Sequence, residues 1–196
     1  MPKTISEHER ELTKKAIIEQ TKKLMRNKGG IKNITVDDIV RAVGLGKGSF
    51  YAYFKSKEEC IYEVIVGSWL NLLCQAEMMV QENMSTKEFV NRFVRNVFLA
   101  DDVSKYISPT DLDMLLRRMP PEKAEEAYRI RSSIETKMMG FLNLSKAQAE
   151  AVHLLLTCVE FVVVAAYEST SDEAKEDVIN ALIETVAEYI DKNKKA

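Results

Sequence analysis

Apolar residues recur along this chain at the three- and four-residue spacing that places side chains on one face of a helix. Helix starts are marked by Ser or Thr followed three positions later by an acid or Gln, as at Thr35 with Asp38. Ser108 followed by Pro109 puts a proline at a first helical position. The β-branched run 162–164 has no second candidate strand to pair with. The pattern therefore predicts an all-α protein of about nine helices, three short or moderate and basic, then six long and acidic.

The stretch from Ser145 to Ser169 differs from the other predicted helices because it is apolar nearly all round. A helix without a polar face must be covered on several sides. It is therefore either the centre of a helical body or part of a bundle between subunits. His153 and Glu160 lie two turns apart on one of its faces, and each is either a pocket group or a satisfied core residue.

The composition indicates which class of protein this is and in which cellular compartment it is expected. The 196 residues are 46% hydrophobic, which is enough for a sizeable core. The longest apolar run, 154–167, is interrupted by Glu160 and is too short to span a bilayer. Cys60, Cys74 and Cys158 are far apart and form no CxxC or Cys/His cluster. We therefore expect a cytoplasmic protein with free thiols, no metal and no cofactor.

The net charge of −2 conceals a strong asymmetry. Residues 1–57 hold 13 Lys and Arg against 6 Asp and Glu, whereas residues 58–196 hold 15 against 24. A small basic domain is typical of a protein that binds phosphate groups, whereas the acidic remainder is not expected to bind them. The alternative is that lysines simply solvate the helix faces.

The stretch from Gly30 to Lys57 predicts two short helices joined by a tight turn. Thr35 caps the first helix, Gly44 ends it by tolerating a left-handed turn, and the second runs from Lys47 to Phe54. Helix, turn and helix is the geometry in which the second helix lies in the major groove of DNA. The predicted inward-facing residues are Val36, Ile39, Val40, Val43, Leu45, Phe50 and Phe54.

The residues left facing outward suit contact with DNA. The lysines can neutralise phosphates, the glycine lets the backbone approach closely, and the serine and tyrosines bring hydroxyl groups. The alternative is that the tyrosines are half-buried packing residues and that the last lysine is an ordinary surface residue. The outward-facing residues are Lys47, Gly48, Ser49, Tyr51, Tyr53 and, just beyond the second helix, Lys57.

This stretch resembles the TetR family of bacterial and archaeal regulators, and the resemblance covers roughly residues 10–65. Three features depart from the family pattern: Gly46 stands where a hydroxyl residue is common, Ala52 where a large polar or aromatic residue is common, and one extra residue lies in 28–30. The matching positions are Thr35-Val36, Ile39, the run from Gly44 to Phe54, and Lys57-Glu58.

The resemblance implies a DNA-binding domain, residues 1–55, and a helical effector-binding and dimerisation domain, residues 56–196. It implies a homodimer joined through the last two helices. Repression is the family's usual mode: the dimer binds a palindromic operator and leaves it when a small-molecule effector binds. Carried over by position, the DNA contacts that it implies are Thr35, Gly46, Lys47, Gly48, Ser49, Tyr51, Tyr53 and Lys57.

The body carries less specific signals. Seven of the nine methionines lie between Met78 and Met139, which indicates either an adaptable ligand cavity or ordinary core filling. Two histidines, no HExxH and no Gly-rich phosphate loop after a strand argue against an enzyme. The alternative function is a non-enzymatic DNA-binding adaptor of the same fold that acts through a protein partner.

Overall fold

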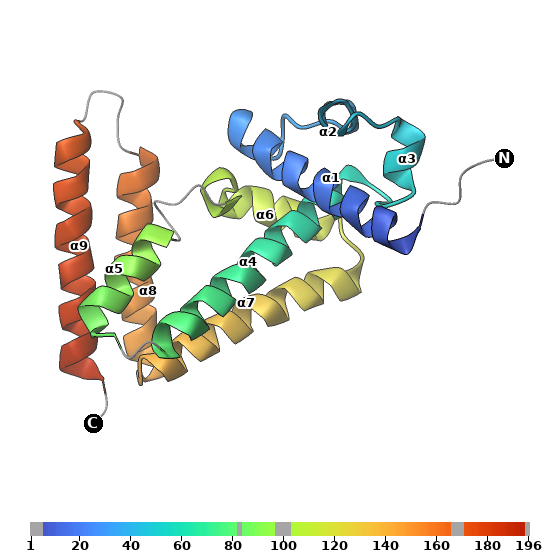
Figure 1. Ribbon diagram of the computed structural model, residues 1–196. Helices are drawn as coiled ribbons and strands as arrows, with labels where there is room; N and C mark the ends of the chain where they lie inside the picture. Colours follow the sequence, from blue (N-terminus) through green and yellow to red (C-terminus); the bar gives the residue numbers. More distant parts are fainter. Residues whose placement is uncertain (1–5, 82–83, 97–102, 166–170, 195–196) are drawn as a thin grey trace. The chain divides into compact units, whose positions relative to one another are not determined.

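The computed structural model describes residues 6–81, 84–96, 103–165 and 171–194, and every regular element in these ranges is helical (Figure 1). This confirms the predicted all-α fold, including the helix expected over 162–164. The elements are α1 (Glu7–Asn27), α2 (Val36–Val43), α3 (Lys47–Tyr51), α4 (Lys57–Gln81), α5 (Thr86–Val94), the 3-10 turn η2 (Val103–Tyr106), α6 (Pro109–Arg117), α7 (Pro121–Phe141), α8 (Lys146–Ala165) and α9 (Asp172–Asn193).

The chain forms two compact units, to both of which α4 and α7 contribute. The functional division that the resemblance implies, 1–55 and 56–196, places its boundary within the first of these units and stays a prediction. The amino-terminal unit consists of Met1–Ser68 and Tyr106–Tyr128, and the carboxy-terminal unit of Trp69–Lys105 and Arg129–Ala196.

Helices α1, α2 and α3 pack in sequence, α1 on α2 and α2 on α3. The cap predicted at Thr35 forms. The Thr35 hydroxyl accepts a hydrogen bond from the Asp38 backbone N–H, and the Asp38 carboxylate accepts one from the Thr35 backbone N–H. Val36, Val43 and Leu45, predicted inward, are only half-buried, because a five-residue α3 covers little of α2. The fully buried side chains of this unit include Ile17, Met25, Ile34, Ile39, Phe50, Phe54 and Ile61.

Gly29 and Gly30, in the segment where the sequence predicts one extra residue relative to the family pattern, form a left-handed turn at the end of α1. Gly29 has φ +63° and Gly30 has φ +134°, values that a side chain makes unfavourable. The Gly30 amide donates to Met25 O over 2.8 Å and so satisfies a carbonyl at the helix end. A Cβ at Gly30 would also lie 3.2 Å from Tyr106 O, so the turn is pressed against the segment that leads to α6.

Helices α6 and α7 are tied to the first turns of α4 in the same unit. The Tyr62 hydroxyl donates over 3.0 Å to Lys123 O on α7 and lies at the same distance from the Glu126 carboxylate. The Lys123 ammonium lies 2.9 Å from Glu59 Oε1. The start of α7 therefore belongs to the packing of the amino-terminal unit.

In the carboxy-terminal unit, α9 packs against both α5 and α8. Phe89 and Phe93 of α5 stack with ring centroids 6.0 Å apart. Polar contacts border this core: Arg95 donates to Glu176 and to Asn180 on α9. The core is built from Met79, Phe89, Val90, Val94, Val152, Val159, Ile179, Ile183, Val186, Ala187 and Ile190.

Three large apolar side chains of the α8 and α9 pair are exposed within this chain. Leu154 and Phe161 of α8 are 67% and 70% exposed, and Val178 of α9 is 45% exposed. Val178 repeats the apolar spacing of α9, as Ile179 and Leu182 do, but it does not lie on the packed face of the helix. His153 is also exposed, so it is no buried polar group, and the side chain of Glu160 lies outside the described residues. The described residues of the unit therefore leave α8 uncovered on the side of Leu154 and Phe161.

Candidate nucleic-acid interface

The turn between α2 and α3 has the geometry that the sequence predicted. Gly44 takes the left-handed conformation, φ +73°, and Leu45 N donates to Val40 O over 2.8 Å. Gly46 is extended and begins α3 without a side-chain cap. Helix α3 ends at Tyr51, earlier than the predicted Phe54, although Phe54 N still donates to Phe50 O at 3.1 Å.

Two phenylalanines fix the orientation of α3. Phe50 and Phe54 are fully buried, with ring centroids 5.6 Å apart. Because they occupy the inner face, the neighbouring side chains of α3 must point outward. Lys47, Ser49 and Tyr51 are all exposed, and Tyr51 keeps 54% of its surface accessible. The short helix therefore exposes a cation and a phenol on one face, at positions four residues apart, and a hydroxyl at Ser49 on another.

Gly46 and Gly48, unlike the left-handed Gly44, are not required by the described fold. A Cβ at Gly46 or at Gly48 would meet no atom within 4 Å. Neither residue is left-handed, so backbone strain does not demand glycine at either position. The surface around α3 is consequently open to a close approach from outside.

Lys47 is held by an acid that the sequence analysis missed. Its ammonium lies 2.9 Å from Asp37 Oδ1 on the first turn of α2. The hydrogen bond and the charge of Asp37 raise the pKa of Lys47. Both side chains are more than half exposed, so the pair is screened by water and contributes little to stability. In the sequence, Asp37 indicated only the start of a helix, because acids are common near the positive end of the helix dipole.

Tyr53 does not face outward as freely as predicted. It is half-buried, and the Arg10 guanidinium lies over its ring at 5.8 Å from the centroid. Arg10 also donates to Ala52 O over 3.2 Å. The amino-terminal end of α1 thus braces the end of α3. The sequence gives no local sign of this contact because it joins residues about forty positions apart.

Lys57 is half-buried, and its ammonium donates to Ile34 O over 2.9 Å. Thr35, the next residue, is exposed and uses its hydroxyl to donate to Asp38 over 2.7 Å. The Lys28 ammonium lies 2.7 Å from the same carboxylate. Hydrogen bonds from Lys28 and from Thr35 hold the pKa of Asp38 well below its usual range. These contacts fix the entry to α2 and tie Lys57 to it.

The eight residues carried over from the family pattern all lie in one stretch, from the start of α2 to the start of α4. The structure brings Lys47 and Tyr51 to one exposed helix and directs Lys57 and Tyr53 partly inward. Among the described residues no group of three His, Cys, Asp or Glu is placed to hold a metal ion. No helix that the structure describes is long and apolar enough to cross a membrane.

The first comparison with known proteins concerns the sequence of this stretch. Residues 17–64 match the family model described as "Bacterial regulatory proteins, tetR family". A comparison with curated proteins gave no match. The matched segment contains α2, α3 and the first turns of α4, and so includes every residue of the candidate interface.

The second comparison concerns the whole fold. The TetR-family regulator PfmR from Thermus thermophilus is 22% identical, with a TM-score of 0.63, over 88% of this chain and 97% of that one. FadR from Bacillus subtilis, in complex with stearoyl-CoA, is 17% identical, with a TM-score of 0.59, over 89% and 96%. A TetR-family protein from Vibrio parahaemolyticus is 15% identical, with a TM-score of 0.58, over 88% and 97%. These likenesses establish the fold.

Proposed function

This chain carries the amino-terminal domain of the TetR family within a TetR-type fold, and we propose that it is a homodimeric repressor of transcription. The dimer binds a palindromic operator and leaves it when a small-molecule effector binds. One observation carries the proposal: α3 is fixed from inside by Phe50 and Phe54 and exposes Lys47, Ser49 and Tyr51 together. We place the operator contacts in residues 1–55 and the effector and dimer contacts in residues 56–196.

Helix α3 enters the major groove, where its residues divide the work. Lys47 neutralises a phosphate, and Tyr51 and Ser49 donate hydroxyl hydrogen bonds to base edges or phosphates. Gly46 and Gly48 let the backbone come close, since no described atom lies within 4 Å of where a Cβ at either position would be. Thr35 and Lys57 contact the phosphates that flank the groove, and Tyr53 contributes its hydroxyl.

The homodimer forms through the exposed apolar face of α8 and α9. Leu154 and Phe161 lie seven residues apart, and so on one side of α8, and Val178 lies on the neighbouring helix α9. Exposed large apolar side chains of this kind mark surfaces where proteins meet. A second copy that presents the same face would cover them symmetrically, as a two-fold interface requires.

Release follows from the spacing of the two α3 helices in the dimer. Both half-sites are engaged only when the helices lie about 34–36 Å apart. An effector that binds more tightly to a dimer conformation with another spacing lowers the affinity for the operator, by as much as its own affinities for the two conformations differ. In return, bound operator lowers the affinity for the effector. The B. subtilis structure contains stearoyl-CoA. By analogy of fold alone, we propose that a ligand binds in the helical body of this chain.

The test is selection of bound fragments from a genomic library by the purified protein at two salt concentrations. The proposal expects one short palindrome, with affinity that falls steeply as salt rises because phosphate contacts release counterions. The alternative is a non-enzymatic adaptor of the same fold that acts through a protein partner. Recovery of many unrelated fragments would favour that adaptor and would overturn the operator-specific repressor.

A further inference from the structure

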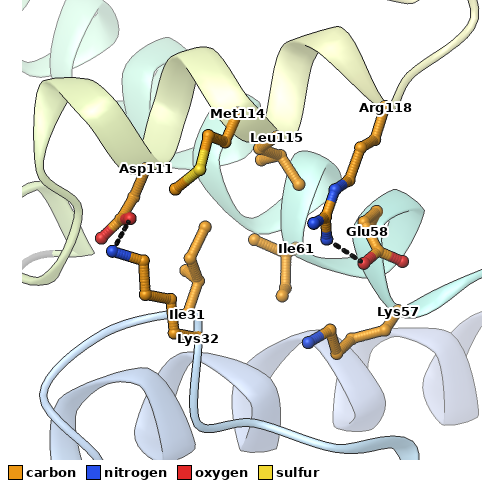
Figure 2. Close-up of a pocket in the computed structure, with 9 residues that line it drawn as sticks. All are labelled: Ile31, Lys32, Lys57, Glu58, Ile61, Asp111, Met114, Leu115 and Arg118. Atoms are coloured by element: carbon orange, nitrogen blue, oxygen red, sulfur yellow. Dashed lines mark hydrogen bonds and ion pairs between the residues drawn. The ribbon is translucent and has the colours of Figure 1, made fainter.

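A cavity of about 250 Å³ lies in the amino-terminal unit, beside the residues proposed to contact DNA. The loop after α1, the first turn of α4 and helix α6 line it (Figure 2). Its apolar side is formed by Ile31, Ile61 and Leu115, all buried, and by Met114 of α6. The volume corresponds to about eight water molecules. The cavity is therefore large enough for a compact organic molecule and too small for a long-chain ligand.

Five charged side chains surround the apolar part, and four of them form pairs. Lys32 Nζ lies 2.8 Å from Asp111 Oδ1, and Arg118 lies 3.4 Å from Glu58 Oε1. Both carboxylates of the lining thus have a cationic partner already. Lys57 is the fifth charge, and it leaves the lining with one positive charge in excess.

Lys57 has bonding capacity to spare. Its ammonium donates to Ile34 O, and no described carboxylate forms an ion pair with it. A lysine ammonium has three donors, so two remain for another acceptor. Figure 2 shows Lys57 reaching from α4 toward the space that Ile31 and Ile61 border. A half-buried cation beside an apolar wall is complementary to an anion that carries an apolar body.

We propose that this cavity binds a small amphipathic carboxylate, such as a single-ring aromatic acid. The ring lies against Ile31, Ile61 and Met114, and the carboxylate accepts charge-assisted hydrogen bonds from Lys57. Arg118 can add a second donor, because its pairing with Glu58 is long and on the surface. A neutral analogue of the same shape lacks the anionic acceptor and binds more weakly.

Occupancy of the cavity also regulates DNA binding, a consequence that rests on the proposed function. Lys57 is one of the proposed phosphate contacts, and a bound carboxylate competes for its ammonium. The occupant further touches the loop that leads into Thr35 and α2. A carboxylate in the cavity therefore lowers operator affinity, and by reciprocity operator DNA lowers the affinity for the carboxylate.

The test is titration of the full chain, without DNA, with benzoate and with benzamide as the uncharged analogue. Binding is followed by calorimetry and by the methyl signals of ¹³C-methyl-methionine. We expect saturable benzoate binding that moves the Met114 signal and leaves the signal of Met25, which is fully buried in the core, in place. Benzamide binds at least about tenfold more weakly, because a neutral group replaces the charged acceptor.

Two variants locate the site, each with a matched control. Lys57→Gln lowers benzoate affinity by about tenfold or more, whereas Lys55→Gln, an exposed lysine outside the cavity, leaves it unchanged. Met114→Trp fills the cavity and abolishes binding, and Met114→Leu retains it. No saturable binding, a Met114 signal that stays in place, or equal affinities in both lysine variants would overturn the proposal.

The effect on DNA is measured separately, so that the two proposals fail independently. Benzoate should weaken operator binding by the wild type, whereas the operator affinity of Met114→Trp, measured with and without benzoate, should not change. If bound benzoate did not change operator affinity, the cavity would still be a ligand site, but the proposed coupling between benzoate binding and DNA binding would be wrong. Absence of operator binding would refute the proposed repressor, while the titration without DNA would still decide the ligand site.

Discussion

Asp37 Oδ1 lies 2.9 Å from Lys47 Nζ, so the single cation of α3 is paired with an acid of α2 before any DNA arrives. A phosphate that binds Lys47 must replace this partner and approach its negative charge. In the proposed interface, Asp37 would therefore compete with the phosphate for Lys47. It also keeps Lys47 in one place, because a long side chain with a partner samples fewer conformations.

Asp37→Asn should tighten operator binding by about three- to tenfold, because one repulsive charge beside the phosphates is lost. Fluorescence anisotropy with the selected operator at low salt measures this. The gain should shrink as salt rises. Asp113→Asn on α6 makes the same change in net charge and should have a smaller effect. An Asp37→Asn variant that binds no better, or more weakly, would mean that the acid orients Lys47 for DNA instead.

Lys47→Ala and Tyr51→Phe should each weaken operator binding by about tenfold, with the dimer intact. Lys47→Ala should also make the salt dependence shallower, because one phosphate contact is lost. Lys192→Ala on α9 is the control for the loss of one lysine. Equal affinity for all three variants and the wild type would remove both residues from the contact list.

Phe161→Glu should weaken dimerisation by at least about a hundredfold, because a charge replaces an apolar side chain at the proposed seam. Analytical ultracentrifugation gives the mass, and circular dichroism confirms that the helices remain. Leu12→Glu on α1 is the control, since Leu12 is also a large exposed apolar residue. Leu182 is a poorer target because it packs partly against the core of its own unit. A Phe161→Glu variant that stays dimeric would place the seam elsewhere.

Cys60 should react slowly with thiol reagents while Cys74 reacts fast. Burial raises the pKa of the Cys60 thiol to about 11, and Thr21 Oγ1 lies 3.4 Å from its sulfur. The thiolate is the reactive form, so labelling of Cys60 in the folded protein should be slow at pH 8, where almost none of this thiol is ionised. Mass spectrometry of partly alkylated protein at pH 8 distinguishes the sites. Equal labelling of Cys60 and the exposed Cys74 would show that the first turns of α4 open readily.

Asp38→Asn should lower the melting temperature of the amino-terminal unit and flatten its dependence on acid. The folded-state pKa of Asp38 is depressed, chiefly by the hydrogen bond from Lys28. Its contribution is therefore fully present above the unfolded pKa, about 3.9, and is lost as pH falls below that value. Thermal melts between pH 2 and pH 6 measure the slope. A variant that loses stability on acidification as steeply as the wild type would assign the slope to other carboxylates.

The elements that were predicted best from the sequence are those that depend on interactions between residues a few positions apart. The caps at Ser6, Thr35 and Ser85 involve residues three positions apart, so a short pattern specifies them completely. The buried faces of α3 and α5 follow in the same way from a spacing of three and four. The helix-turn-helix was predictable because glycine, which has no Cβ, takes the left-handed φ of position 44 without strain.

The remaining features depend on contacts between distant residues. Tyr53 is half-buried because Arg10 lies on its ring, and Lys57 points inward because Ile34 O is within reach. Neither partner is a neighbour in sequence. Val178 repeats the apolar spacing of its helix and is nevertheless exposed. Periodicity cannot distinguish a face that packs within one chain from a face that is left for a second copy.

The left-handed turn at Gly30 limits how this protein can be divided. Because Tyr106 O presses on that turn, the contact surface of the first three helices continues into residues 106–128, far along the chain. A chimaera that joined residues 1–55 to the body of another protein of this fold would lose this support and would expose apolar side chains such as Ile31. A domain swap that preserves sequence recognition has to bring the segment from Tyr106 to Tyr128 with the helix-turn-helix, or rebuild an equivalent surface in the recipient.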